Sequence, residues 1–151
     1  MTAHPIRTLA VALALAVAPA VAPAALAQDA KPPLVTVVTA EHPQTQLMAM
    51  VLTMQAVEQG HAVDMLLCGP AGDIALADAP DSATAGQPPR GASPQGLMQA
   101  IMQAGATVRV CAVYLPGKDL GPEALLEGVG VAQPPAQAAA MLRPDAVVWS
   151  F

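Results

Sequence analysis

The segment Leu34-Val-Thr-Val-Val-Thr-Ala40 is apolar and rich in β-branched residues, as is typical of a strand buried in a parallel sheet. Residues 44–59 follow it and contain neither glycine nor proline. Apolar residues recur there at helical spacing: Leu47, Val51, Met54 and Val57. Gly60 then supplies a helix-ending residue. The two segments predict a β-strand followed by an α-helix.

The same alternation continues along the rest of the chain. Further strands are predicted at residues 61–67, 107–113, 129–131 and 146–150, and further helices at 93–104, 122–127 and 136–142. Ser93 and Pro94 suit the cap and the first turn of the helix that they open. Strands that alternate with helices favour parallel pairing with right-handed crossovers. We therefore expect an α/β fold, a small doubly wound parallel sheet of about five strands flanked by helices, with strand order 2-1-3-4-5.

The connection at residues 69–92 is long for a compact domain and is rich in glycine, proline, alanine and aspartate. A segment of this kind is either a functional lid or a disordered insertion, with one helical turn predicted at residues 74–76.

The N-terminal residues are arranged as in an export signal, with a charged region, an apolar region and a cleavage site in that order. Arg7 precedes an apolar stretch that ends at Pro19, and Ala25-Leu26-Ala27 supplies the small residues of a cleavage site. We expect a signal peptide at residues 1–27, a single domain at 28–151, a periplasmic location, and no membrane association after cleavage. The alternative is an uncleaved membrane anchor.

Composition excludes two classes of protein. The 151 residues contain six Lys and Arg against eleven Asp and Glu, for a formal net charge of -5. A chain with so few cations cannot neutralise a row of phosphates, so we expect no nucleic-acid partner. Two cysteines allow at most one bridge, which excludes a small domain built on several disulfides.

Three polar or reactive side chains lie at or near the ends of predicted strands: His42 and Cys68 follow the first two strands, and Cys111 lies near the end of the third. In open α/β sheets such positions meet at the carboxyl edge, near the switch point of the topology, where ligands bind. Cys111 is the candidate catalytic residue, because a thiol that faces a helix start gains thiolate character, as sulfur transfer requires. The alternative is a buried, inert cysteine.

Cys68 is a candidate second thiol. With strand order 2-1-3, strand 1 would lie between the two cysteines and separate them by roughly 10 Å, beyond the reach of a relaxed bridge. Export to an oxidising compartment favours a bridge instead. The sequence leaves both outcomes open.

Other motifs give weaker indications. Met50/Met54 and Met98/Met102 are spaced to share a helix face and could bind Cu(I), but core packing also explains them. His42 and His61 lie in no zinc-binding pattern, and no phosphate-binding glycine motif is present, so no metal and no cofactor are expected. Arg109 should lie on the sheet face opposite Val110, directed to solvent or to an oligomer contact.

The chain resembles the DsrE/DsrF-like family, which includes the TusD-type sulfur-relay proteins. The resembling parts are the strand at 34–40, the helix that ends at Gly60, the strand before Cys68, Gly105-Ala-Thr-Val-Arg-Val-Cys-Ala-Val-Tyr114, and Leu125-Leu126-Glu-Gly-Val-Gly-Val131. The family's sulfur-carrying cysteine, where present, matches Cys111. The resemblance implies a sulfur carrier or transferase that holds sulfane sulfur as a persulfide on Cys111.

The resemblance also implies partners: sulfur donor and acceptor proteins or small thiols, and further copies of the chain in a homo-oligomer. The helix at 44–59 offers an interface through Met48, Met50 and Leu52. We therefore expect an exported sulfur-handling protein in which residues 69–92 control access to Cys111. The alternatives are a non-catalytic oligomeric binding or assembly module, and a periplasmic soft-metal (copper) binder.

Overall fold

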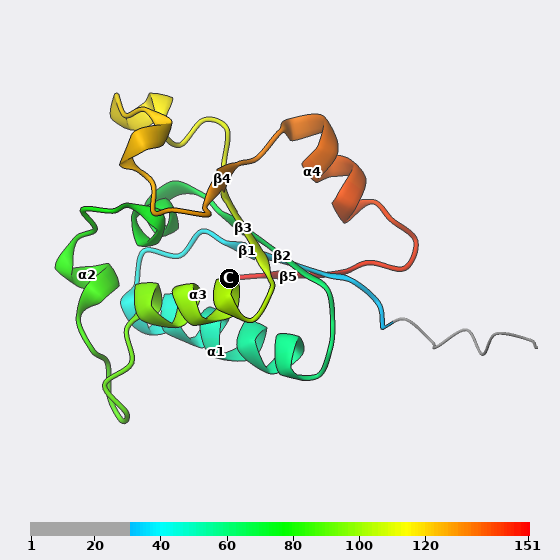
Figure 1. Ribbon diagram of the computed structural model, residues 1–151, viewed down its shortest axis with the longest axis horizontal. Coiled ribbons are helices and arrows are strands. Elements are labelled where there is room, and N and C mark those ends of the chain that lie inside the picture. The colour runs from blue at the N-terminus through cyan, green and yellow to red at the C-terminus, as the bar shows by residue number, and fades with distance from the viewer. Residues whose placement is uncertain (1–30) are drawn as a thin grey trace, which may run out of the picture.

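Five parallel strands form one sheet in the order β4-β3-β2-β1-β5 (Figure 1). The computed structural model describes residues 31–151. The strands are β1 (Leu34–Val38), β2 (Val63–Leu67), β3 (Thr107–Val110), β4 (Gly130–Val131) and β5 (Val147–Ser150). The predicted fold class, an α/β parallel sheet of about five strands flanked by helices, is confirmed.

The predicted signal peptide, residues 1–27, lies outside the described residues. Within residues 31–151, none of the helices combines the length and the apolar character that crossing a bilayer requires.

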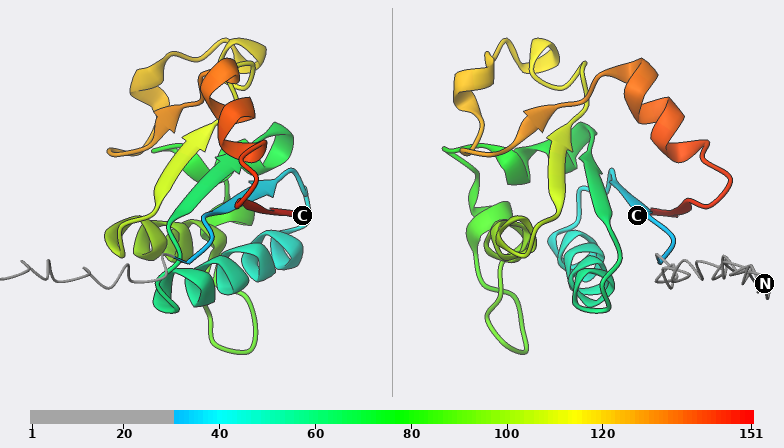
Figure 2. Two further views of the ribbon diagram at one scale, coloured as in Figure 1. Left: turned by 90° about the vertical axis from the view of Figure 1, so that its right-hand side faces the viewer. Right: turned by 45° about the vertical axis from the view of Figure 1, so that its right-hand side comes forward.

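Helices cover both faces of the sheet. Helices α1 (Pro43–Glu58) and α3 (Pro94–Gln103) lie side by side on one face, and α4 (Pro134–Met141) lies on the other (Figure 2). The N-terminus of α1 is capped by His42, whose Nδ1 accepts a hydrogen bond from the backbone N–H of Gln44 at 3.3 Å. The hydroxyl of Ser93 caps α3 in the same way, as predicted, by accepting from the N–H of Gly96 at 3.1 Å.

The predicted strand order 2-1-3-4-5 is wrong. After β1, the chain adds β2, β3 and β4 successively on one side, and α4 then returns it so that β5 pairs with β1. The crossovers from β1 to β2 and from β2 to β3 place their helices, α1 and α3, on the same face. The chain reverses its direction across the sheet between β1 and β5. This reversal between β1 and β5 is the switch point of the topology. Cys68 and Cys111 lie away from it, at the ends of β2 and β3.

The core lies between the sheet and the helix pair α1 and α3. Its largest fully buried side chains come from strands, helices and the segment after β2: Val38, Met50, Met65, Leu67, Ile74, Met98, Ile101, Val108 and Val110. Met50 and Met98 are completely buried there, whereas Met54 and Met102 are partly buried against the same cluster. The methionine pairs thus fill the core, one of the two interpretations that the sequence allowed.

Residues 69–85 are packed into the domain, which contradicts a disordered insertion. They form the 3₁₀-helix η1 (Gly69–Ala75) and the short helix α2 (Asp81–Thr84). Ile74 and Ala75 are fully buried in the core. The amide of Gln95 in α3 donates hydrogen bonds to the carbonyl oxygens of Ile74 at 3.0 Å and Leu76 at 2.8 Å. These contacts fix the segment because each buried carbonyl finds a donor.

Candidate functional site

Cys68 and Cys111 face each other at the carboxyl edge of the sheet and are joined by a disulfide. The register of the neighbouring strands β2 and β3 pairs Leu67 with Val110, so the next residues along the two strands are the cysteines. The backbone N–H of Cys111 donates to the Leu67 carbonyl at 2.9 Å, which extends the ladder to this point. The Cα atoms of the two cysteines are 5.1 Å apart, well within disulfide range. The predicted separation of roughly 10 Å was wrong, because strand β1 does not lie between them.

Both cysteines are half-buried, so each residue keeps part of its surface exposed to solvent. Cys111 packs against the hydrophobic core cluster, while Val113, two residues further along, is 77% exposed. The cysteines are therefore held by packing without being fully enclosed.

A side-chain cluster beyond the disulfide joins the loops that follow β2 and β3. The Tyr114 hydroxyl donates a hydrogen bond of 2.6 Å to Oδ1 of Asp73, and Lys118 forms an ion pair with the same carboxylate. The Tyr114 ring packs on Gly72, where a Cβ atom would overlap it. Lys118 belongs to the 3₁₀-helix η2 (Pro116–Lys118), and Asp73 belongs to η1. We call Asp73, Tyr114 and Lys118 the loop clamp.

Backbone hydrogen bonds reinforce the loop clamp. The N–H of Leu126 donates to the carbonyl of Ala75 at 2.9 Å, and the N–H of Ala77 donates to Ala124 at 2.9 Å. Ala124 ends the 3₁₀-helix η3 (Pro122–Ala124). The loops after β2 and β3 are therefore bound to each other at several points besides the disulfide.

Burial raises the pKa of the Tyr114 phenol well above its usual value, and the hydrogen bond to Asp73 and the negative charge of that carboxylate raise it further. All three effects disfavour the phenolate. Tyr114 thus remains a hydrogen-bond donor to Asp73 throughout the physiological pH range.

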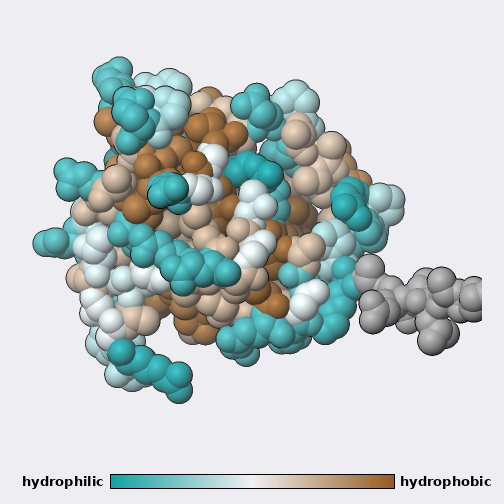
Figure 3. Space-filling view, viewed as in Figure 1, coloured by the Kyte–Doolittle hydropathy of each residue, from teal (hydrophilic) through white to brown (hydrophobic). Residues whose placement is uncertain are grey.

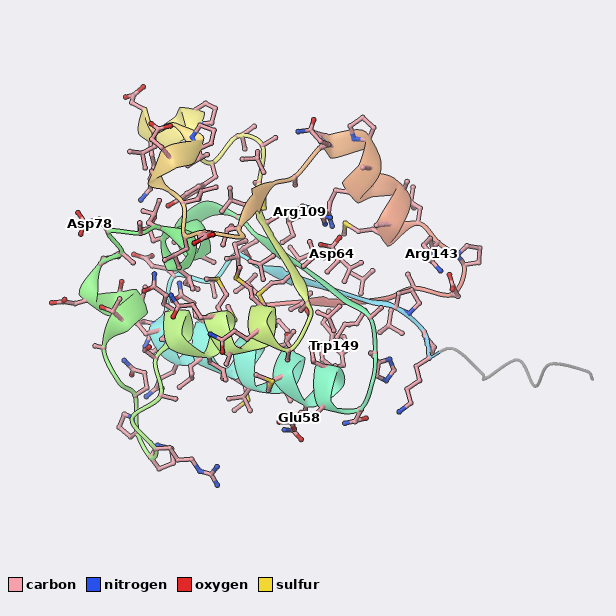
Figure 4. All side chains as sticks on the ribbon, in the orientation of Figure 1. Glu58, Asp64, Asp78, Arg109, Arg143 and Trp149 are labelled. Carbon is pink, nitrogen blue, oxygen red and sulfur yellow. A yellow bond between two sulfur atoms is a disulfide. The ribbon has the colours of Figure 1, made fainter. Side chains whose placement is uncertain are left out.

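Arg109 forms an ion pair with Asp64, on the face of the sheet that α4 covers (Figure 4). The sequence predicted a role in solvent or in an oligomer contact and missed this partner. The register places Arg109 beside Leu66 of the neighbouring strand β2. Asp64 lies two residues before Leu66 on the same strand, so its carboxylate is within reach of the Arg109 guanidinium. A cavity of about 250 Å³ next to the pair is lined by Gln133 and Gln137 of the α4 region.

His42 and His61 have local structural contacts. His42 caps α1, and Nδ1 of His61 lies 2.8 Å from the carbonyl oxygen of Pro32. Within residues 31–151, no three His, Cys, Asp or Glu side chains are grouped closely enough to hold a metal ion. The site that the sequence predicted at the carboxyl edge therefore reduces to the two cysteines and the loop clamp.

The loop clamp went unnoticed in the sequence. Asp73 and Tyr114 are 41 positions apart and belong to no recognised motif. The only available signal was that each lies a few residues after a cysteine: Asp73 five after Cys68, and Tyr114 three after Cys111.

Tyr114 is the only tyrosine in the chain, so its ionisation can be followed directly by phenolate absorbance during a pH titration. We expect the midpoint to lie above the ordinary value of 10.0. Because the unfolded state loses this proton first, the stability that the neutral phenol contributes is complete below pH 10.0 and is lost as the pH rises toward the folded pKa. An Asp73→Asn variant should titrate at lower pH. A midpoint at the ordinary value would show that Tyr114 is neither buried nor bonded to Asp73.

Reduction of the disulfide should destabilise the fold without abolishing it. The bridge closes a loop with a sequence separation of 43, for which loop-closure entropy predicts a contribution of about 4 kcal/mol. Urea unfolding with and without reductant measures the difference, and a double Cys68→Ser, Cys111→Ser variant should match the reduced protein. Equal stability of the oxidised and reduced forms would contradict the observed pairing.

Comparison with known proteins shows the fold. No protein-family model matches the chain, and no curated protein matches it in sequence. Among solved structures, the ychN protein from E. coli has a TM-score of 0.63 and 18% identity, over 79% of this chain and 98% of that one.

A second solved structure gives the same result. The protein of unknown function MTH1491 from Methanobacterium thermoautotrophicum has a TM-score of 0.55 and 12% identity, over 79% of this chain and 99% of its own. Both have the DsrE/DsrF-like fold. The resemblance found in the sequence is therefore confirmed at the level of the fold: this chain has a five-stranded, all-parallel α/β fold of the DsrE/DsrF type.

Proposed function

We propose that the protein is an exported sulfur carrier of the periplasm that holds sulfane sulfur as a persulfide on Cys111, with Cys68 as its second thiol. The observation that supports this most is the pairing of two half-buried cysteines at the carboxyl ends of adjacent parallel strands. Reactive groups in open α/β sheets gather at this edge. An oxidising compartment is also where such a pair persists as a disulfide.

The chemistry uses the reduced pair. The thiolate of Cys111 attacks the sulfane sulfur of a donor, and the bond between that sulfur and the donor breaks, leaving its electron pair on the donor. An acceptor thiolate then attacks the outer sulfur of the Cys111 persulfide and regenerates the Cys111 thiolate. Alternatively, Cys68 attacks the inner sulfur, which restores the disulfide and expels sulfide. No metal or cofactor is needed in any of these steps.

Assembly into a homo-oligomer is the second part of the proposal. Met48, Val51 and Leu52 are exposed on α1, and Val147 and Val148 are exposed on the edge strand β5. Figure 3 shows hydrophobic residues at the surface in the middle of one face of the molecule, with hydrophilic residues around them. Leu52 and Val147 line one pocket, so the exposed apolar residues of α1 and β5 are neighbours, as in a protein interface.

The expected interface needs one correction. Met50 is fully buried in the core and cannot contribute to an interface, whereas Met48 and Leu52 remain available. A groove of about 570 Å³, lined in part by Met48 and Val51, runs between α1 and the segment at residues 87–90.

Sulfur loading can be tested on single-cysteine variants treated with polysulfide. Cys68→Ser leaves Cys111 as the only thiol, and we expect its intact mass to increase by about 32 Da, the mass of one sulfur atom. The increase should disappear when a thiol acceptor or reductant is added. Cys111→Ser is the matched control, and it should gain several-fold less because Cys68 is not the carrier.

Two outcomes would contradict the carrier proposal. One is a Cys68→Ser protein that folds, as judged by circular dichroism, and takes up no sulfur. The other is equal loading of the two variants. Either result would favour the second candidate function, a non-catalytic assembly module, in which the disulfide only stabilises the fold.

Light scattering at micromolar concentration tests the assembly proposal. We expect a mass that is a multiple of the mature chain, and we expect Leu52→Glu to lower it by placing a charge in the interface. Leu142 is another exposed leucine, at the end of α4, so Leu142→Glu is the matched control and should leave the mass unchanged. A monomeric wild-type protein would overturn the proposal.

A further inference from the structure

We propose that hydrogen sulfide loads the oxidised protein directly, by opening the Cys68–Cys111 disulfide. This inference rests on the proposed function, because it identifies the sulfur source for the same cysteine pair. The disulfide then serves as the oxidant that converts sulfide into sulfane sulfur.

The reaction balances without any further reagent. Hydrosulfide attacks one sulfur of the disulfide, a new sulfur–sulfur bond forms, and the Cys68–Cys111 bond breaks. The products are a persulfide on one cysteine and a thiolate on the other. Sulfide loses two electrons, and the disulfide gains the same two. Transfer of the outer sulfur to an acceptor thiol leaves the protein as a dithiol.

The position of the disulfide suits this attack. Both cysteines are half-buried rather than enclosed, and hydrosulfide is the smallest thiol nucleophile, so it can reach sulfur atoms that larger thiols approach with difficulty. Two carboxylates on these strands and loops are paired with cations, Asp73 with Lys118 and Asp64 with Arg109. Their negative charges are therefore offset as an anion approaches.

The surrounding structure keeps the two sulfur atoms together after the bond opens. The backbone N–H groups of Cys68 and Cys111 donate to the carbonyls of Val38 and Leu67, both at 2.9 Å, so each cysteine remains at the end of the ladder. The loop clamp and the backbone bonds between the two loops do not involve the disulfide. Opening the bridge therefore requires little movement of the backbone.

This retention makes the loading reversible. The displaced thiolate stays opposite the persulfide at a high effective concentration, so it can attack the inner sulfur and expel sulfide again. It can also take over the outer sulfur, which lets the persulfide form on either cysteine and still reach Cys111. The persulfide should therefore accumulate only while sulfide is abundant or until an acceptor removes the outer sulfur.

Intact-mass measurement on the oxidised wild-type protein tests the inference. The protein is treated anaerobically with sodium sulfide, alkylated, and compared with fully reduced protein alkylated in the same way. We expect a species that carries two alkyl groups and about 32 Da of additional mass, for one sulfur atom. Its fraction should increase with sulfide concentration and fall at least several-fold if sulfide is removed before alkylation.

Two controls contain no disulfide and should gain no sulfur from sulfide: reduced wild-type protein and the Cys68→Ser variant. Reduced wild-type protein needs no substitution, so the control holds even if the variant folds poorly. Equal sulfur uptake by these controls would show that the reagent contains sulfane sulfur and would overturn the inference.

The two proposals fail differently. If Cys68→Ser takes up sulfur from polysulfide but the oxidised wild-type protein gains none from sulfide, direct loading is wrong and the carrier function stands. If neither protein takes up sulfur, the carrier function itself is wrong.

Discussion

The alignment of β2 beside β3 brings the two cysteines of this protein together. Their register, Leu67 opposite Val110, makes Cys68 and Cys111 the next pair along the two strands. A parallel ladder holds neighbouring backbones about 5 Å apart, which is also the Cα separation that a disulfide needs. The cysteines therefore meet through ordinary strand pairing, and no special loop conformation has to bring them together.

The loops that leave this edge depend on the same alignment. Each begins at a cysteine, and each then contributes to the loop clamp, Asp73 from one side and Tyr114 with Lys118 from the other. The connection after β2 is consequently part of the core, with Ile74 fully buried. The site thus combines a reducible bond with a frame that does not depend on that bond. We therefore expect the frame to keep the thiols opposed after reduction, as the proposed sulfur exchange requires.

The elements of the fold could be predicted from local signals, whereas their order in the sheet could not. The β-branched run after Leu34, Gly60 at the end of the first helix, and the Ser93-Pro94 start each determine one element through their own chemistry. The choice of whether β3 pairs with β1 or with β2 leaves no such local trace, since both orders satisfy right-handed crossovers. The predicted separation of Cys68 and Cys111 failed with that choice. Asp73 and Tyr114 were missed because their contact arises only when the two loops fold together.

The most direct test of this account is the covalent state of the purified mature protein. Its intact mass should increase by about 2 Da on reduction, as two thiols form from one bridge, and an unreduced peptide map should recover the peptides of Cys68 and Cys111 as one linked species. Two free thiols in protein isolated from an oxidising compartment, with no linked peptide, would contradict the strand alignment on which the site depends.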